Sequence, residues 1–409
     1  MRIPLACLCY LTALLCKEIA VTLPGIFLLY QVCWPSREKP QAKTDVLIPF
    51  ACLCATFGLY VVLRASAVGL STAPDAFPAW VAAWQRLGLV FITAGFYLTK
   101  LLLPINLCYY SNLVIPGTWT EVFRSPFFAM GGIFLISGCV ALKMAPRLGF
   151  ALAWIGCALL PVLNIIALPV LAKENYLYIP SVGFCLVFSL VIAKQGSRTK
   201  AALFFLVVFC LIGLVYGAAT VRRNNDYRDP VIFLNSTLDA MPPIAPHQIE
   251  DGRYFEGVKN IYTTHRNLGR IYRQRGQMQK AARAFEQALL FTPSYFSPRY
   301  AAETRESLGS IYEKTGELEK ARKVLNEVLP VTSRPYYVHN VLGVICVRLD
   351  EDPKAEEHFK QALKIQDTYA PAHYNLGMLY MKLNRLQMAK EELTKAGRLD
   401  PKYEKLLPR

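Results

Sequence analysis

The sequence predicts an all-α protein in which a polytopic helical membrane domain precedes an α-solenoid. Of the 409 residues, 54 % are hydrophobic and only 18 % are charged, whereas soluble chains carry about 25 % charged residues. The charge is uneven: residues 1–220 hold 15 Lys and Arg against 6 Asp and Glu, and residues 221–409 hold 30 against 23. This composition excludes a disordered or collagen-like chain, and the length suits two or three domains.

The apolar first half, residues 1–220, contains stretches close to the ~20 residues that span a bilayer. The clearest are 45–69, 125–142, 148–172, 177–193 and 201–220. Residues 3–34 predict two short spans that meet at Lys17 and Glu18, with a signal peptide as the alternative for 1–15. Residues 87–109 predict an interfacial or re-entrant segment, because Lys100 and Pro104 interrupt them.

Loop charge predicts the topology of this half. The positive loops 36–43, 143–147 and 194–200 all face the cytoplasm if residues 87–109 do not cross the membrane. About seven spans then follow an inside N-terminus, and the second half of the chain lies outside. Arg222 and Arg223 after the last span count weakly against this arrangement. We expect a multi-pass protein of the endoplasmic reticulum membrane in a eukaryote, or of the inner membrane in a bacterium.

A repeated motif marks the second half. Leu-Gly pairs, three of which continue as Leu-Gly-x-x-Tyr, begin at Leu268, Leu308, Leu342 and Leu376. A second helix follows each time, with Ala at 281, 321, 355 and 389 and a Phe or Leu four residues later. The Gly and Ala suit close approach of two helices, and the Tyr and Phe fill the space between neighbouring repeats. A glycine between the helices permits the tight reversal.

The spacing of this motif identifies tetratricopeptide repeats. It is 34 residues between the last three copies and 40 between the first two, with the extra residues near 294–300. We expect a linker over 221–260 and four repeats over 261–403, at about 262–295, 302–335, 336–369 and 370–403. Such repeats stack into a superhelix with a concave binding face and carry no catalytic role by themselves.

One face of the first helix of each repeat predicts a binding surface for a protein or peptide. Its members are Arg266, Arg270, Arg273, Glu303, Glu306, Glu313, Tyr337, Asn340, Tyr374 and Met378. This order, basic then acidic then aromatic, suits a peptide of mixed charge, and a solvated helical face is the alternative. Asn267 and Asn375 resemble asparagines that hold a peptide backbone in other repeat proteins, although Ser307 and Val341 interrupt the series.

We predict no metal site, no resident cofactor and no nucleic-acid partner. His265, His339 and His373 share one position in separate repeats, which favours packing over a common metal centre. The excess positive charge is spread over the membrane loops, and acids balance it in the repeats.

Asn235 begins an Asn-Ser-Thr triplet after the last span and is a glycosylation acceptor if the host is eukaryotic, with chance occurrence as the alternative.

Two ionisable pairs in apolar surroundings are candidate functional groups: Lys17 with Glu18, and Lys173 with Glu174. The alternative is that each pair marks where a helix meets water.

Four sequence blocks, at 15–30 (LCKEIAVTLPGIFLLY), 101–107 (LLLPINL), 174–185 (ENYLYIPSVGFC) and 223–234 (RNNDYRDPVIFL), resemble the family of transmembrane and tetratricopeptide-repeat-containing proteins. The blocks keep the family's order across nearly the whole chain.

The resemblance implies a multi-span glycosyltransferase, similar to protein O-mannosyltransferases that move mannose from a polyprenyl-phosphate donor to Ser or Thr hydroxyls outside the membrane. It implies that the repeats capture the acceptor polypeptide. It makes Glu18 and Glu174 candidate catalytic residues, and Lys17 and Lys173 candidate ligands of the donor phosphate.

Two departures from the family keep a second hypothesis open. The family's N-terminal spans, with an acidic pair in the first external loop, have no counterpart before Met1, and Asp75 and Glu121 lie outside that motif. The family's Glu-Arg pair is Glu174-Asn175 here. The second hypothesis is therefore a catalytically inactive, membrane-anchored repeat scaffold for protein–protein interaction. A transporter is the third and weakest, because few polar residues occur along the spans.

Overall fold

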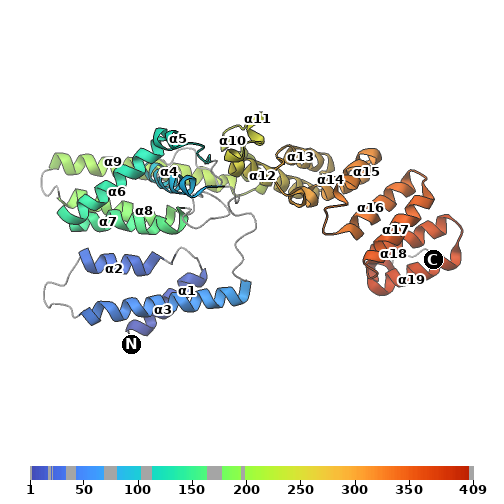
Figure 1. Ribbon diagram of the computed structural model, residues 1–409, viewed down its shortest axis with the longest axis horizontal. Coiled ribbons are helices and arrows are strands. Elements are labelled where there is room, and N and C mark those ends of the chain that lie inside the picture. The colour runs from blue at the N-terminus through green and yellow to red at the C-terminus, as the bar shows by residue number, and fades with distance from the viewer. Residues whose placement is uncertain are drawn as a thin grey trace. The chain divides into compact units, whose positions relative to one another are not determined.

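The computed structural model describes residues 2–16, 20, 22–33, 43–68, 81–102, 113–163, 177–194 and 199–404. These residues form helices and connecting segments and contain no strand, which confirms the predicted all-α class (Figure 1). The chain divides into two compact units, Met1–Ile244 with Asp251–Gly257, and Ala245–Glu250 with Val258–Arg409. Each unit is described by itself below.

The first unit is built from helices α1 to α10. Their bounds are α1 Arg2–Cys16, α2 Leu23–Cys33, α3 Lys43–Val68, α4 Ala83–Leu102, α5 Trp119–Arg124, α6 Pro126–Met144, α7 Pro146–Leu159, α8 Tyr178–Lys194, α9 Thr199–Asp226 and α10 Pro230–Ala240, with 3-10 turns at Leu160–Val162 and Gly252–Tyr254. Helices α4, α6, α7, α8 and α9 pack in that order, α1 packs on α3, and α2 packs on α3 and α7.

Glycines set the closest helix crossings of this unit. A methyl group on Gly95 of α4 would lie 1.8 Å from the Phe127 carbonyl oxygen of α6. Gly149 of α7 also lies close to the Leu142 backbone of α6, and a methyl group there would come within 2.6 Å of it. Since no side chain fits at these distances, the helices approach backbone to backbone. Leu89, Tyr97 and Leu159 are fully buried beside these crossings.

Within the described ranges, α6 is the one helix with the length and apolar composition of a membrane span. It coincides with the predicted span 125–142, its mean hydropathy is 1.8, and only 11 % of it is buried. Shorter apolar stretches lie at Leu47–Leu63, Pro146–Val162, Ile179–Ala193 and Leu206–Val215. The multi-pass topology therefore stays a prediction. Large apolar side chains on several helices of this unit, among them Ile136, Leu214 and Val62, are exposed.

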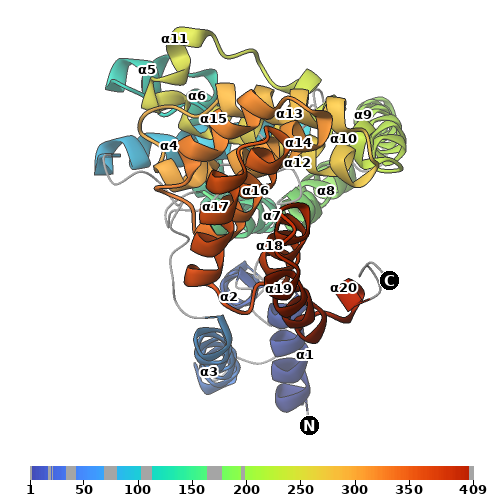
Figure 2. The same ribbon diagram turned by 90° about the vertical axis from the view of Figure 1, so that its right-hand side faces the viewer.

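The second unit consists of four helix pairs, which follow one another in chain order in Figures 1 and 2. The pairs are α12 (Phe255–Gln274) with α13 (Met278–Leu290), α14 (Ala302–Thr315) with α15 (Leu318–Val328), α16 (Pro335–Arg348) with α17 (Asp352–Ile365), and α18 (Ala370–Lys382) with α19 (Leu386–Leu399). Short helices α11 (Pro246–Ile249), η5 (Pro298–Ala301) and α20 (Pro401–Glu404) accompany them. The predicted helix-pair architecture is thus present.

Each first helix, called helix A here, ends in the same turn before helix B. A residue one or two positions after the end of helix A has a positive φ: 73° at Gly276, 88° at Gly316, 57° at Asp350 and 56° at Asn384. The next amide donates back across the turn, as from Gln277 to the Tyr272 carbonyl at 2.9 Å and from Arg385 to the Tyr380 carbonyl at 2.8 Å. This is a Schellman cap. The sequence predicted it at the two glycines, and Asp350 and Asn384 fill the same place because these residue types tolerate the left-handed region.

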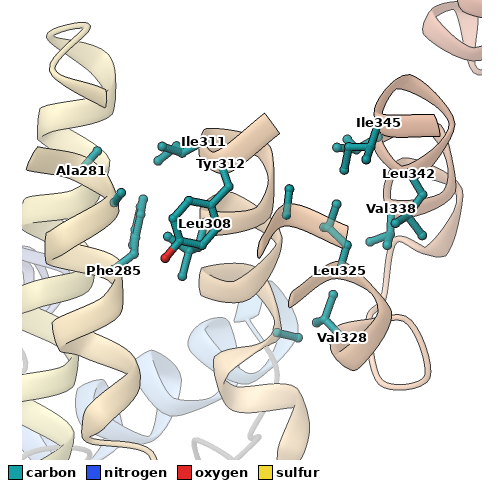
Figure 3. Packing of buried hydrophobic residues seen from close by; sticks show 14 residues of the cluster. Ala281, Phe285, Leu308, Ile311, Tyr312, Leu325, Val328, Val338, Leu342 and Ile345 are labelled. Carbon is teal, nitrogen blue, oxygen red and sulfur yellow. The ribbon is translucent and has the colours of Figure 1, made fainter. Parts of the chain in front are cut away.

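A glycine on each helix A receives a large side chain from helix B. A methyl group on Gly309 would lie 2.6 Å from Leu325, and one on Gly343 would lie 2.5 Å from Phe359. Gly269 meets Phe285 and Gly377 meets Leu393 in the same way. Figure 3 shows Phe285 beside Leu308 and Tyr312, and Leu325 and Val328 facing Val338 and Leu342 of the next pair. The glycine contacts close each pair, and the apolar side chains join one pair to the next.

The segment expected to be a linker, 221–260, is mostly helical in the structure. It contains the end of α9, all of α10 and α11, and the start of α12. Asp229 accepts a hydrogen bond from the Val231 amide at 2.6 Å, and Pro230 occupies the first turn of α10. A capping carboxylate followed by proline is a helix-start signal that the polar composition of this stretch concealed.

The glycine contact predicts the effect of a small substitution. We expect Gly309→Ala to destabilise the second repeat by about 1–3 kcal/mol, because the methyl group overpacks Leu325. Hydrogen exchange of α14 and α15 in the full chain, followed by mass spectrometry, would measure the lost protection. The neighbouring substitution Ser310→Ala is the control and leaves protection unchanged. Unaltered exchange in Gly309→Ala would contradict the packing account.

Candidate peptide-binding surface

The helix-A stripe is the predicted binding surface, defined by the ten residues named above from Arg266 to Met378. Its members lie two or five residues to either side of the Leu of each Leu-Gly pair, so they share one face of each helix A. In the first repeat, Arg270 and Arg273 are exposed. Arg273 Nη1 donates to Ser307 Oγ at 3.3 Å, and the Arg266 guanidinium lies over the Tyr262 ring at 5.7 Å.

Two of the three acids of the stripe are already neutralised inside the protein. Glu306 is only 2 % exposed and accepts hydrogen bonds from Arg334 Nη2 at 2.5 Å and from the Thr332 hydroxyl. Burial alone would lower the pKa of Arg334, but attraction to Glu306 outweighs it and raises that pKa. Glu313 in turn accepts from Arg348 at 2.9 Å. The interpretation of a mixed-charge surface therefore changes in part: Glu303 stays exposed, and the larger open charge is the basic charge of Arg270 and Arg273 in the first repeat.

Two asparagines meet in the last two repeats. Asn375 Nδ2 donates to Asn340 Oδ1 at 2.9 Å. Within the described part of the chain, this contact leaves the Asn340 amide donor and the Asn375 amide oxygen without a protein partner. A donor and an acceptor placed side by side match the N–H and C=O of an extended peptide. Asn267, by contrast, makes no side-chain hydrogen bond among the described residues.

Tyrosines lie near the two asparagines in the sequence of the third and fourth repeats. The Tyr336 and Tyr369 rings lie 4.9 Å apart, as do those of Tyr374 and Tyr403, and Arg334 lies over the Tyr337 ring at 5.3 Å. Burial, helped by the neighbouring tyrosines, raises the pKa of Tyr369 to about 12. The third and fourth repeats thus present a neutral aromatic surface with an amide pair within it.

The three periodic histidines each contact groups of their own repeat. His339 Nδ1 lies 3.1 Å from His358 Nδ1, and His373 Nδ1 lies 2.5 Å from Glu392 Oε2. His265 stacks on Phe291. Sequence reasoning missed His358 and Glu392, although each lies 19 residues after its partner on helix B. The described residues hold no group of three or more ligands able to bind a metal.

The candidate catalytic pairs, Lys17 with Glu18 and Lys173 with Glu174, lie outside the described residues. Glu121 is described and accepts from the Gly117 amide at 2.7 Å and from Arg253 Nη1 at 3.1 Å, so it closes the first turn of α5. Asn235 is exposed but lies within α10 rather than in a loop.

Comparison with known proteins gives two kinds of match. Sequence profiles of the tetratricopeptide repeat match residues 260–334 and 370–403. These segments are tetratricopeptide repeats. Among solved structures, that of MamA is 24 % identical, covering 35 % of this chain and 75 % of that chain with a TM-score of 0.30. YrrB, described as a TPR protein with an unusual peptide-binding site, is 18 % identical. The match covers 44 % of this chain and 92 % of that chain with a TM-score of 0.31.

Three curated relatives carry the name Protein O-mannosyl-transferase. Tmtc2 of Drosophila melanogaster is 29 % identical over 153 residues, which are 34 % of this chain and 14 % of the relative. TMTC3 of Mus musculus is 21 % identical over 245 residues, which are 56 % of this chain and 24 % of the relative. Tmtc1 of Drosophila melanogaster is 33 % identical over 100 residues, which are 22 % of this chain and 12 % of the relative. The chain spans at most 24 % of the length of these relatives, and its homology to them is distant.

The His339–His358 contact predicts a pH dependence. Burial lowers the pKa of both groups, and the nearby His339 lowers that of His358 further. The folded state then binds fewer protons than the unfolded state below the ordinary histidine pKa of about 6.5, so stability falls as the pH falls through that value. We expect α16 and α17 to lose hydrogen-exchange protection between about pH 7 and pH 5, after correction for intrinsic exchange.

Substitution separates this contact from other acid effects. His358→Gln removes one of the two titrating rings and should make the loss of protection shallower. His247→Asn, at an exposed histidine outside the helix pairs, is the control and should leave the loss unchanged. Equal pH dependence in wild type and His358→Gln would refute the assignment.

Proposed function

We propose that the repeats bind a polypeptide segment in extended form along the helix-A stripe. The observation that carries this proposal is the Asn340–Asn375 pair, which offers one donor and one acceptor beside tyrosine rings. Backbone recognition of this kind tolerates many sequences, because every residue except proline has the same N–H and C=O groups. Neighbouring side chains then set the preference of the surface.

The charges of the stripe indicate the preferred segment. Arg270 and Arg273 are exposed, as is Glu303, while Glu306 pairs with Arg334, the residue before α16, and Glu313 pairs with Arg348 of α16. A segment with carboxylates against the first repeat and with aromatic or proline residues against the last two would complement this surface. The partner is therefore an acidic-then-apolar stretch of protein, and no nucleic acid or metal is invoked.

We propose further that this binding serves sugar transfer at a membrane, as the names of the distant relatives and the four resembling sequence blocks favour. The repeats would hold an acceptor polypeptide on the external side of a multi-pass apolar half. A carboxylate, Glu18 or Glu174, would take the proton of a Ser or Thr hydroxyl. The hydroxyl oxygen would attack the anomeric carbon of mannose, and the polyprenyl phosphate would leave with its charge held by Lys17 or Lys173.

A membrane-anchored scaffold without chemistry of its own is the second candidate. It is favoured by Glu121, the described acid of the predicted external loop 71–124. The Glu121 carboxylate already accepts hydrogen bonds from the Gly117 amide and from Arg253. The exposed apolar surface around α6 supports membrane attachment under either candidate.

Peptide binding is tested with two blocked synthetic 12-residue probes, one with three Glu before Pro-Tyr pairs and one with Lys in place of Glu. The full chain in detergent should bind the acidic probe more tightly. We expect Arg270→Gln with Arg273→Gln to remove that preference, a loss of about tenfold, because contacts to charged groups contribute about 1.5–3 kcal/mol. Arg283→Gln, on the exposed face of α13, is the matched control. Equal binding of both probes by wild type would contradict the basic surface.

Sugar transfer is tested separately, in membranes that contain the full chain and a polyprenyl-phosphate mannose donor. If the acids are catalytic, Glu18→Gln or Glu174→Gln lowers transfer about 10²–10⁴-fold, the usual effect of losing a general base. Glu121→Gln is the control and keeps full transfer. Full transfer after replacing both Glu18 and Glu174 would contradict these catalytic assignments, and it would not affect the peptide-binding proposal.

A further inference from the structure

The extra residues between the first two repeats form a fixed segment, not a free loop. The Ser294 amide and hydroxyl donate to Glu250 at 3.0 and 2.7 Å. The Tyr295 hydroxyl donates to the Ile249 carbonyl at 3.2 Å. At the other end, the Tyr300 ring lies 4.8 Å from that of Tyr262 and 4.6 Å from that of Phe296. The six-residue insertion is therefore anchored on both sides.

This segment lines an open pocket, to which it contributes Ser294, Phe296 and Tyr300 among other residues. The pocket has a volume of about 330 Å³, at the lower end of the range for ligand sites. Its apolar wall includes Phe296, Tyr300 and Val331, and its two charged residues are Arg305 of α14 and Glu327 of α15. The helix-A stripe contributes none of the residues that line it.

Arg305 has an unusual place in the repeat frame. It holds the position that His339 and His373 hold in the later repeats, where the side chain 19 residues further on, His358 or Glu392, supplies a polar partner. In the second repeat that residue is Val324. The half-buried Arg305 guanidinium consequently has no hydrogen bond or ion pair within the described ranges. A guanidinium fork is preorganised to receive both oxygens of a carboxylate.

We propose that this pocket binds a peptide carboxylate at Arg305 and the apolar side chain next to it against Phe296, Tyr300 and Val331. The inference rests on the proposed peptide-binding function and deepens it, because it gives the bound polypeptide a second contact away from the helix-A stripe. Glu327 lines the same pocket and repels a second carboxylate, so the site selects one carboxylate beside one apolar group. That carboxylate belongs either to a chain terminus or to an Asp or Glu side chain.

Three small probes test the chemistry and its source, with the full chain in detergent and ligand-observed NMR. N-acetyl-phenylalanine carries a terminal carboxylate, N-acetyl-Phe-Asp-amide carries a side-chain carboxylate, and N-acetyl-phenylalanine amide carries none. We expect at least one of the two acids to bind five-fold or more tightly than the amide. A preference for the first acid identifies a chain terminus as the source, and a preference for the second identifies an acidic side chain.

Substitutions assign the preference to Arg305. Arg305→Gln should abolish it, and Arg305→Lys, which keeps the charge but not the fork, should retain part of it. Arg299→Gln, an exposed arginine of the same segment that does not line the pocket, should leave it intact. Unchanged hydrogen exchange of α14 shows that the Arg305 variants are folded.

Two results overturn the pocket proposal: equal binding of acids and amide by wild type, or a preference that survives Arg305→Gln. The 12-residue probes decide whether the proposed function falls with it. If Asn375→Ala still weakens binding of those probes, only the pocket proposal is wrong. If Asn375→Ala has no effect on them, the helix-A stripe is not the binding surface, and the proposed function fails as well.

Discussion

The contact between a helix-A glycine and a large helix-B side chain is the constraint on which the repeat unit depends. At Gly269, Gly309, Gly343 and Gly377 the two helices are so close that a methyl group would come within 2.7 Å of the facing side chain. This approach fixes the position and orientation of each pair. Once the pairs are alike, side chains of α13, α15 and α17 meet the next helix A in a regular way. One apolar cluster joins the first two pairs to α16, and a second joins the third pair to the fourth.

Regular stacking also explains how charges are distributed. Helix A of one repeat lies beside helix A of the next, so a side chain on the stripe reaches its neighbour along the chain. Glu306 and Glu313 meet Arg334 and Arg348 in this way, and Asn340 meets Asn375. Two of the three carboxylates of the stripe are paired through stacking, whereas Glu303 and the two arginines Arg270 and Arg273 stay exposed. A repeat protein thus converts a mixed sequence pattern into a surface with one dominant charge.

The irregular features are the informative ones for function. The insertion after α13 breaks the 34-residue spacing, and the second repeat carries Arg305 where the third and fourth repeats carry a histidine with a helix-B partner. Each departure is harmless to stacking, because Gly309 and Leu325 keep their contact. Together they make a pocket with an open guanidinium beside aromatic rings. In the first unit, glycines allow close helix crossings, and large apolar side chains are exposed.

The sequence by itself determined the all-α class and the helix pairs, because Leu, Gly, Tyr and Ala recur at distances that only one local geometry satisfies. It also indicated Asn340, Asn375, Tyr337 and Tyr374 as candidate binding residues, of which Asn340 is only 7 % exposed. It did not disclose the Asp350 and Asn384 caps, the helices within residues 221–260, or the pairing of Glu306 with Arg334. Only the tertiary structure decided these, because a residue's charge and type are local, whereas its partner depends on which helix the fold brings within hydrogen-bond distance.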